Sequence, residues 1–384
     1  MSFTPLFSIL LPYFIYAPKS HVNMPKAKLT PDELNEKLAQ LNNVLEQQQN
    51  ADEKDVAALL QTYTQLAETH SDLRQFSDAI TALEAALPLT KQQAAESHPE
   101  ITEADVLYEL AVAHHRAQED YEKAMEYALQ ALEQFEAAHA NGKLAKAYQR
   151  IGLIHVAENN WDAALEALEQ SVEWAERLED WEELGGTYAT IADVYRIQNQ
   201  FQEALEYYKQ AIENYEKCDA DQYLGSVYQI IAEIMAHHQK REQALKCYGE
   251  AAFYFEKAGS HDEAAMVNAY AGKLLVPVRK YPEAIAYFQT AIQQFTQAGN
   301  PFEATNCHIQ IAGIYEEEKQ WQKAVETYRQ ALPLAQATAD EVLIDTIDES
   351  LAHALQQQEI TPVPPEQTGK SGGFFSKLKG LFGS

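Results

Sequence analysis

Cysteine is scarce in this sequence, which has three cysteines among 384 residues. Cys218, Cys247 and Cys307 lie far apart and form no CxxC pair. Because their number is odd and their spacing matches no zinc motif, the pattern argues against a disulfide framework and a structural metal site. We interpret all three as small buried hydrophobic residues of a protein in a reducing compartment.

Basic residues are also in short supply. Lysine and arginine number 29 against 58 aspartates and glutamates, which gives a formal net charge of −29. Nucleic-acid binding depends largely on Lys and Arg side chains that neutralise phosphates, so this balance argues against a nucleic-acid partner. The same balance favours solubility and partners with basic surfaces.

Recognisable catalytic motifs are missing. The sequence contains no Gly-rich phosphate loop, no HExxH and no nucleophile elbow. The histidines of the pairs His114–His115 and His237–His238 are adjacent, so on a helix their side chains point about 100° apart and form no two-ligand face. We therefore expect a protein that is not an enzyme and that holds no cofactor and no metal.

The sequence also lacks an uninterrupted apolar run of the length that a membrane-spanning helix needs. The apolar start SFTPLFSILLPYFIYAPKSH is interrupted by Pro12, is short for a membrane helix and lacks the basic n-region of a secretion signal. A more ordinary start follows at Met24. We interpret residues 1–29 as an N-terminal extension, either disordered or a weak targeting piece, and expect a cytoplasmic protein.

What the sequence does contain is an internal repeat, in which alanines recur with a step of 40 residues from the second one onward. These alanines are Ala79, Ala124, Ala164, Ala204, Ala244, Ala284 and Ala324. Seven positions after each stands another small residue, namely Ala86, Ala131, Ser171, Ala211, Ala251, Ala291 and Ala331. Three positions before most of them stands an aromatic residue, namely Phe76, Tyr121, Trp161, Phe201, Tyr281 and Trp321.

This spacing has a simple physical interpretation. An offset of seven returns to the same face of a helix after about two turns, so the small residues share one face. Small side chains on that face let a neighbouring helix approach closely, and the aromatic residue sits at the start of the helix. Each 40-residue unit is therefore predicted to be a helix, a tight turn and a second helix.

The unit resembles the tetratricopeptide repeat (TPR), in a 40-residue form of that family. The family pattern is matched by Tyr188, Ile191, Ala192, Tyr195, Ala204, Tyr208 and Ala211. It is matched again by His308, Ile311, Ala312, Tyr315, Ala324, Tyr328 and Ala331. The resemblance implies an all-α fold, a right-handed solenoid of about seven helix-turn-helix repeats over residues 56–342.

Both ends of such a solenoid need a cap, because a terminal repeat leaves its apolar face open. Residues 30–55 begin with a capping-box pattern and carry a leucine stripe, so we expect an N-terminal capping helix there. A short dimerising coil is the alternative. We expect a C-terminal capping helix over residues 343–357 and a flexible Pro- and Gly-rich linker over residues 358–373.

The last eleven residues, 374–384, are FFSKLKGLFGS, and they are amphipathic if helical. The apolar face would hold Phe374, Phe375, Leu378, Leu381 and Phe382, with Lys377 and Lys379 away from its centre. This pattern is typical of a helix that lies in an anionic membrane interface, which would make the protein a peripheral membrane protein. Docking of the tail onto the protein itself or into a partner's groove is the alternative.

The tail also resembles the membrane-attachment loop of the soluble NSF attachment proteins, which are all-helical repeat proteins. The likeness is carried by Phe374, Phe375, Ser376, Leu381, Phe382 and Gly383. In that family the loop lies near the N-terminus, whereas here the segment is C-terminal and its middle is longer.

In TPR proteins the first helix of each repeat lines a concave groove, and the resemblance transfers that role to eleven positions. They are Gln149, Leu153, Asp193, Arg196, Gln229, Glu233, His237, Lys273, Asn306, Ile309 and Glu316. We therefore predict a non-catalytic scaffold or adaptor that binds a protein partner, as an extended peptide or a helix, in this groove. A regulator that responds to a peptide or signalling domain, and a vesicle-fusion adaptor, are the alternatives.

Overall fold

The computed structural model describes residues 29–51, 54–93, 101–118 and 120–360. Every regular element in these ranges is helical, which confirms the all-α prediction. Residues 1–28 of the N-terminal extension, most of the predicted linker and the tail lie outside the described residues. So do all seven predicted contact residues of the tail: Phe374, Phe375, Lys377, Leu378, Lys379, Leu381 and Phe382. Within the described residues, no helix combines the length and the apolar character that crossing a membrane requires.

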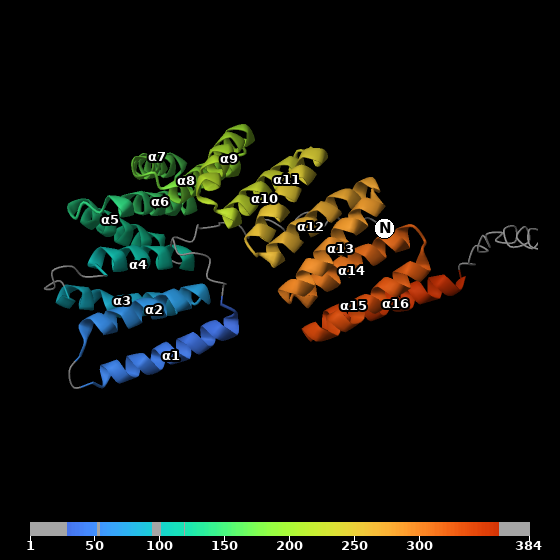
Figure 1. Ribbon diagram of the computed structural model, residues 1–384, viewed down its shortest axis with the longest axis horizontal. Coiled ribbons are helices and arrows are strands. Elements are labelled where there is room, and N and C mark those ends of the chain that lie inside the picture. Colours follow the sequence, from blue (N-terminus) through green and yellow to red (C-terminus); the bar gives the residue numbers. More distant parts are fainter. Residues whose placement is uncertain (1–28, 52–53, 94–100, 119, 361–384) are drawn as a thin grey trace, which may run out of the picture. The chain divides into compact units, whose positions relative to one another are not determined.

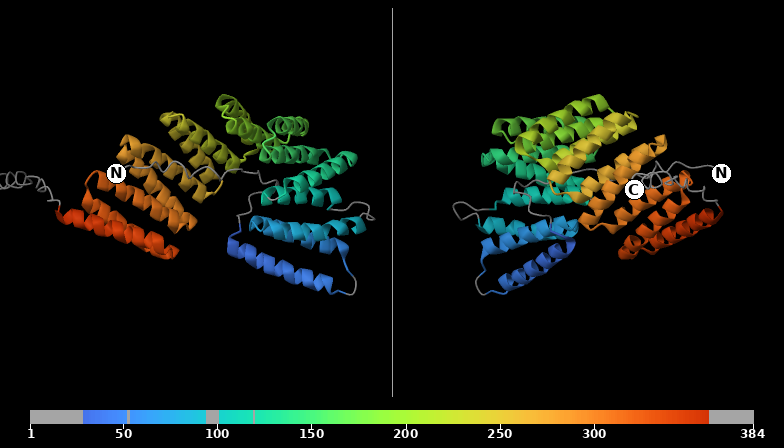
Figure 2. Two further views of the ribbon diagram at one scale, coloured as in Figure 1. Left: turned by 180° about the vertical axis from the view of Figure 1, so that it is seen from behind. Right: turned by 45° about the vertical axis from the view of Figure 1, so that its right-hand side comes forward.

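The chain divides into two compact units, Met1–Ala220 and Asp221–Ser384. In each of them the helices lie side by side in chain order (Figures 1 and 2). Unit 1 contains α1 Pro31–Gln49, α2 Val56–Asp72, α3 Phe76–Gln93, α4 Glu103–Ala117, α5 Tyr121–Ala137, α6 Asn141–Ala157, α7 Trp161–Leu178, α8 Trp181–Ile197, α9 Phe201–Tyr215 and the 3₁₀ helix η2 Glu216–Cys218. Unit 2 contains α10 Asp221–His237, α11 Arg241–Lys257, α12 His261–Leu275, η3 Val276–Val278, α13 Tyr281–Ala298, α14 Pro301–Glu317, α15 Trp321–Thr338 and α16 Glu341–Ile360.

The small residues of the repeat lie where the spacing predicts. All seven alanines of the first set are fully buried, and so are the six alanines and Ser171 of the second set. Two glycines, on α8 and α10, show how close the packing is. These helices are the first of their repeats, and we call the first helices of the repeats the inner helices. A Cβ atom built on Gly185 would lie 2.7 Å from the ring of Tyr215, and one on Gly225 would lie 2.7 Å from the ring of Phe255. Small side chains therefore set the distance between neighbouring helices.

The turns between helices repeat as regularly as the core. From His139 to Ala339, a residue with left-handed backbone conformation recurs every twenty positions. Only two of these residues, Gly259 and Gly299, are glycines. The predicted aromatic residues are the first residues of α3, α5, α7, α9, α13 and α15. Each helix and its turn thus occupy twenty residues, and two of them make one repeat.

The two terminal helices lie against the neighbouring repeats. The side chain of Thr30 accepts a hydrogen bond from the Glu33 amide, and Glu33 accepts one from the Thr30 amide, which is the capping box predicted at the start of α1. Leu38, Leu41 and Leu45 pack against the cluster formed by α2, α3 and α4. At the other end, α16 extends to Ile360, three residues into the predicted linker.

Candidate functional site

Two of the predicted groove residues in unit 1 are buried rather than available to a ligand. Gln149 and Leu153 of α6 are each 4% exposed. The Gln149 side chain donates a hydrogen bond to Thr187 Oγ1 of α8 at 3.2 Å. Thr187 Oγ1 in turn lies 2.9 Å from Ser171 Oγ of α7. Both side chains are thus taken up by the packing of inner helices α6 and α8 at this depth, whereas the sequence placed them on the lining of the groove.

The other predicted pair of unit 1, Asp193 and Arg196 of α8, is partly exposed and held in one geometry. Arg196 Nε and Nη2 lie 2.8 and 2.7 Å from Asp193 Oδ1. The hydroxyl of Tyr208, a fully buried residue of α9, donates to the same carboxylate oxygen at 2.7 Å. Burial and the Asp193 charge raise the pKa of Tyr208 well above its ordinary value, so its hydroxyl remains a donor. A carboxylate and a guanidinium are thus presented together and pre-organised.

In unit 2 the predicted residues lie on α10, α12 and α14. The Gln229 amide donates to Glu233 at 3.0 Å, and the Lys273 ammonium lies 5.6 Å from the centre of the Tyr270 ring. Asn306 donates to Glu303 at 3.3 Å. Glu233 and Glu303 both raise the pKa of Tyr270, after the larger effect of burial.

The remaining predicted residues of unit 2 differ in exposure. His237 is exposed, and its ring meets that of His238 edge to face at 5.2 Å. Ile309 is half-buried against the cluster of α15 and α16. Glu316 accepts a hydrogen bond from Tyr328 at 3.4 Å. The inner helices of unit 2 therefore present a mixed polar and aromatic surface.

Sequence reasoning missed a buried polar cluster on the inner helices of unit 1. Arg150 of α6 is 1% exposed, and its Nη1 lies 3.1 Å from His115 Nδ1 of α4. On the other side, Glu183 of α8 is 9% exposed and interacts electrostatically with Lys146 and Arg150. Two polar atoms of the cluster, Arg150 Nε and Glu183 Oε1, make no hydrogen bond.

The cluster shifts the protonation of its members in opposite directions. Burial, and then the charges of Arg150 and Arg116, lower the pKa of His115 to about 3, so the imidazole is neutral. Burial raises the pKa of Glu183 to about 7, although Lys146 and Arg150 oppose this rise. A strongly shifted carboxyl group with one unpaired oxygen, which interacts with an arginine that has an unpaired Nε, marks a candidate functional site.

A sequence signal for Arg150 does exist, although it needs the repeat to be aligned. Moving 40 residues forward from Arg150 leads to Thr190, which is buried at the same helical position, and two further steps lead to Ile230 and Tyr270, which are half-buried. A charged and buried residue stands out among these uncharged ones in that alignment. Its consequence for Glu183 could not be predicted, because no local pattern links positions 33 residues apart.

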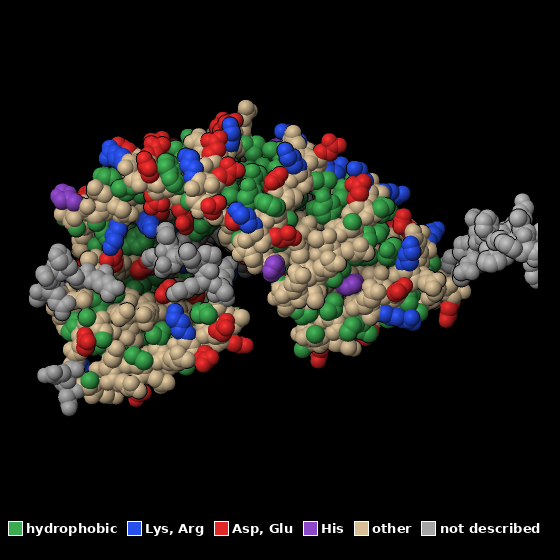
Figure 3. All heavy atoms as spheres, in the orientation of Figure 1, with side chains coloured by type: hydrophobic (Ala, Val, Ile, Leu, Met, Phe, Trp, Pro, Cys, Tyr) green, Lys and Arg blue, Asp and Glu red, His purple; other side chains and the backbone are tan. Residues whose placement is uncertain are grey.

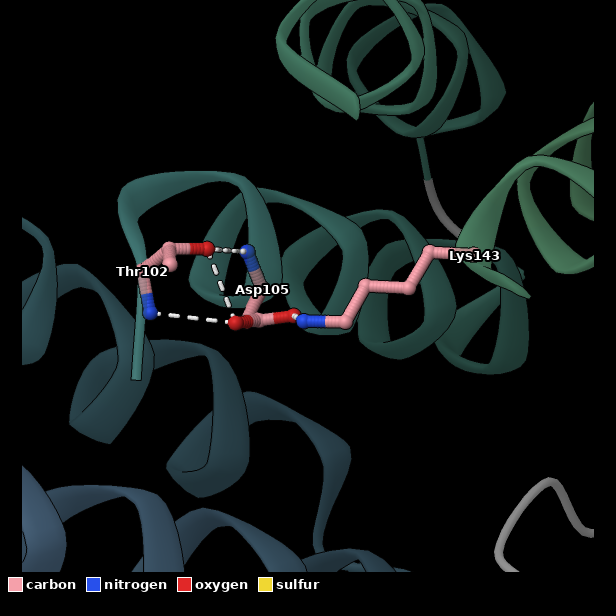
Figure 4. A network of polar contacts seen from close by, with 3 residues as sticks. All are labelled: Thr102, Asp105 and Lys143. Carbon is pink, nitrogen blue, oxygen red and sulfur yellow. Dashed lines mark hydrogen bonds and ion pairs between the residues drawn. The ribbon is translucent and has the colours of Figure 1, made fainter. Parts of the chain in front are cut away.

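Helices α4 and α6 are also joined at their first turns, as Figure 4 shows. Thr102 and Asp105 form a capping box at the start of α4. The Lys143 ammonium of α6 pairs with the second oxygen of the Asp105 carboxylate. Lys143 is thus engaged in an exposed ion pair away from the buried cluster.

The cysteines follow the prediction only in part. Cys307 is buried, and burial raises the pKa of its thiol to about 12. Cys247 is half-buried, but Cys218 is exposed, because it lies in η2 at the end of unit 1. Among the described residues, no group of three or more His, Cys, Asp or Glu side chains could hold a metal ion.

Comparison with family models assigns two parts of the chain. The tetratricopeptide repeat model matches residues 102–177 and 143–217, which include the buried cluster. The model of the soluble NSF attachment protein family matches residues 238–359. That match covers helical repeats and ends before residues 374–384, the tail that resembles the membrane-attachment loop of the same family. None of the curated proteins with which the sequence was compared matches it.

Solved structures with similar folds were also found. The apo form of the quorum sensor NprR from B. thuringiensis is 15% identical, with 79% of this chain and 82% of that chain covered and a TM-score of 0.50. A signal transduction ATPase with a tetratricopeptide repeat sensor, from Pyrococcus horikoshii, is 16% identical, with 93% and 56% covered and a TM-score of 0.53. At these identities the likeness establishes the helical-repeat fold alone.

Proposed function

We propose that this chain, of which residues 102–217 match the tetratricopeptide repeat model, is a non-catalytic adaptor or regulator that binds a protein partner along its inner helices. The observation that carries this proposal is the fixed arrangement of Asp193, Arg196 and Tyr208. Side chains that are held in place before binding lose little conformational entropy when a partner arrives. A paired carboxylate and guanidinium can hydrogen-bond the backbone and polar side chains of an extended segment.

Unit 2 supports the same function with different chemistry. Glu233 and Lys273 are exposed, and Tyr270 offers a ring face that already attracts the Lys273 ammonium. The mixed lining suits a segment with both polar and aromatic contacts rather than a uniformly charged one. Figure 3 shows acidic and basic side chains interspersed over the face that it draws. An extended protein segment is therefore the partner that we propose.

Capture experiments with altered inner faces test this function. A triple variant, Asp193→Ala, Arg196→Ala and Glu233→Ala, is expected to recover the partner at least tenfold less well than the natural chain. The matched control is Lys209→Ala with Glu213→Ala, since this exposed pair lies on α9 and forms only a weak surface ion pair. Equal recovery by the triple variant and the control would move the contact to another surface.

A second proposed function, attachment to a membrane surface, is supported by the amphipathic pattern of residues 374–384 and by the match of residues 238–359 to the attachment protein family. Five apolar side chains beside lysines suit reversible binding to anionic lipid. Sedimentation with anionic vesicles should bring down the full chain but not a chain that ends at residue 370. If both chains stay in the supernatant, the membrane proposal fails while the adaptor proposal stands.

A further inference from the structure

Helix α6 is exceptional in its charge. Its sequence, NGKLAKAYQRIGLIHVA, contains Lys143, Lys146 and Arg150 but neither Asp nor Glu. All other α-helices in the described part of the chain carry at least one acidic residue. In a chain with twice as many acidic as basic residues, this positive helix lies within the inner surface of unit 1.

Two of these basic residues act together. Lys146 and Arg150 are four positions apart, so their side chains lie on the same face of α6. Both interact with the carboxyl group of Glu183 across the gap to α8. Lys146 is half-buried and Arg150 lies beneath it, with its Nε atom lacking a hydrogen-bond partner.

The internal charge compensation of this pair is incomplete. A buried guanidinium is costly unless its donors are all satisfied. Glu183 leaves one carboxyl oxygen without a hydrogen bond, and His115 offers Arg150 a neutral acceptor instead of an anion. The positive charge of Lys146 and Arg150 is therefore incompletely compensated, and a second carboxylate at Lys146 would compensate it further.

We propose that the half-buried Lys146, with the charge of the buried Arg150 beneath it, binds a carboxylate group of the partner segment, and that Glu183, the resident carboxyl group, takes up one proton from solvent as this carboxylate arrives. The proposal rests on the proposed function in one respect, since the ligand is part of a protein partner. One O–H bond forms on the Glu183 carboxylate as one O–H bond of a hydronium ion in the solvent breaks and leaves water.

The charges around Glu183 explain why binding of a carboxylate should be accompanied by uptake of a proton. Lys146 and Arg150 of α6 stabilise its anion, whereas Asp180 and Glu182 at the start of α8 oppose it. From η2, the Lys217 ammonium lies over the Trp181 ring, and burial, followed by the charges of Glu182 and Asp180, raises the pKa of the Cys218 thiol. A second carboxylate beside Lys146 and Arg150 adds repulsion, so the neutral form of Glu183 becomes favoured.

The expected result is binding that weakens as the pH rises above about 7. Below that pH Glu183 is already largely protonated, and the partner's carboxylate binds without proton uptake. Above it, each pH unit lowers the affinity by up to about tenfold, because one proton must be taken up. The net charge of the whole chain opposes an acidic ligand at long range, but about 150 mM salt confines that repulsion to roughly 8 Å.

Hepta-glutamate and hepta-lysine peptides, each labelled with fluorescein, are the probes for the full chain. Fluorescence anisotropy at pH 6, 7, 8 and 9 should show hepta-glutamate binding that follows this pH dependence. Glu183→Gln should remove the pH dependence and bind at pH 8 as the natural chain does at pH 6. Lys146→Ala should weaken binding at least tenfold, whereas Lys143→Ala, the control on the same helix, should leave it unchanged.

Three results would overturn the proposal: no binding of hepta-glutamate, preference for hepta-lysine, or equal binding by the Lys146→Ala variant. A pH dependence that survives in Glu183→Gln would refute the role of Glu183. Circular dichroism checks that each variant is folded. If the inner-face triple variant captures partners normally while the peptide results hold, the proposed function fails and the carboxylate site remains.

Discussion

The guanidinium of Arg150 on α6 donates a hydrogen bond from Nη1 to Nδ1 of His115 on α4, across 3.1 Å. Arginine keeps its charge in proteins, so the imidazole must be neutral to accept this bond. Burial and the positive charges of Arg150 and Arg116 keep it so. The contact joins two inner helices with a charged donor and a neutral acceptor, and this arrangement gives the unit a testable response to pH.

Replacing Arg150 with methionine should raise the pKa of His115 only in part. The variant removes one of two positive neighbours, but burial, the largest cause of the low pKa, remains. We expect the pKa to rise from about 3 while staying below the ordinary 6.5. Histidine NMR titration measures it. An unchanged pKa would mean that the Arg150 charge does not act on His115.

The Glu183 carboxyl group should make the folded protein less stable as the pH rises. Its pKa is raised from 4.5 to about 7 in the folded state, so the stability from its protonation is fully present below about 4.5 and is lost as the pH rises through about 7. His115 has the opposite effect, because its pKa is lowered from 6.5 to about 3 and its contribution is lost as the pH falls through that range. Between pH 4.5 and 6.5 the two residues therefore change the unfolding free energy in opposite directions as the pH rises.

Glu183→Gln should therefore reveal the pH dependence of the unfolding free energy that His115 causes. We expect urea unfolding of the variant to lose up to about 1.4 kcal/mol of unfolding free energy per pH unit as the pH falls below 6.5, where the natural chain changes little. Near pH 8 the variant should be more stable than the natural chain. If the unfolding free energies of the two proteins depend on pH in the same way, Glu183 and His115 do not have opposite effects on stability.

Two glycines offer a test of helix packing. Gly225→Ala places a Cβ atom 2.7 Å from the Phe255 ring, whereas the same change at Gly249 meets nothing within 4 Å. Overpacking should lower the unfolding free energy of Gly225→Ala by about 1–3 kcal/mol. Gly249→Ala, in the interior of α11, should raise it by up to about 1 kcal/mol because alanine is the better helix former. Urea denaturation measures the unfolding free energy of both variants. Similar changes at both sites would show that Gly225 and the Phe255 ring are not in close contact.

The left-handed turn residues provide a further test. Lys319 is exposed and has a φ of 58°, a conformation that costs a side-chain-bearing residue free energy. Lys319→Gly should raise the unfolding free energy by about 0.5–1 kcal/mol, since the strain relieved exceeds the added flexibility of the unfolded chain. Gly259→Ala, at an equivalent turn, should lower it by a similar amount. Thermal unfolding measures the stability of both variants. If Lys319→Gly is less stable than the natural chain, the left-handed backbone of Lys319 carries no strain.

Much of the fold could be predicted because it is encoded locally and seven times over. Ala164 and Ser171 lie on one helix face, and Trp161 begins that helix, for reasons that involve neighbours within two turns. The capping box at Thr30 is equally local. The division into two units at residue 220 was not predicted, because the forty-residue spacing continues through it unchanged.

The candidate site was decided by tertiary structure. The sequence alone determined that inner helices would repeat every forty residues and which positions could face inward. It did not determine that Gln149 and Leu153 would be buried, or that Arg150 would lie between His115 and Glu183. Exposure and pKa depend on the side chains that other helices place nearby, more than thirty residues away along the chain, and only the packing of three helices brings those side chains together.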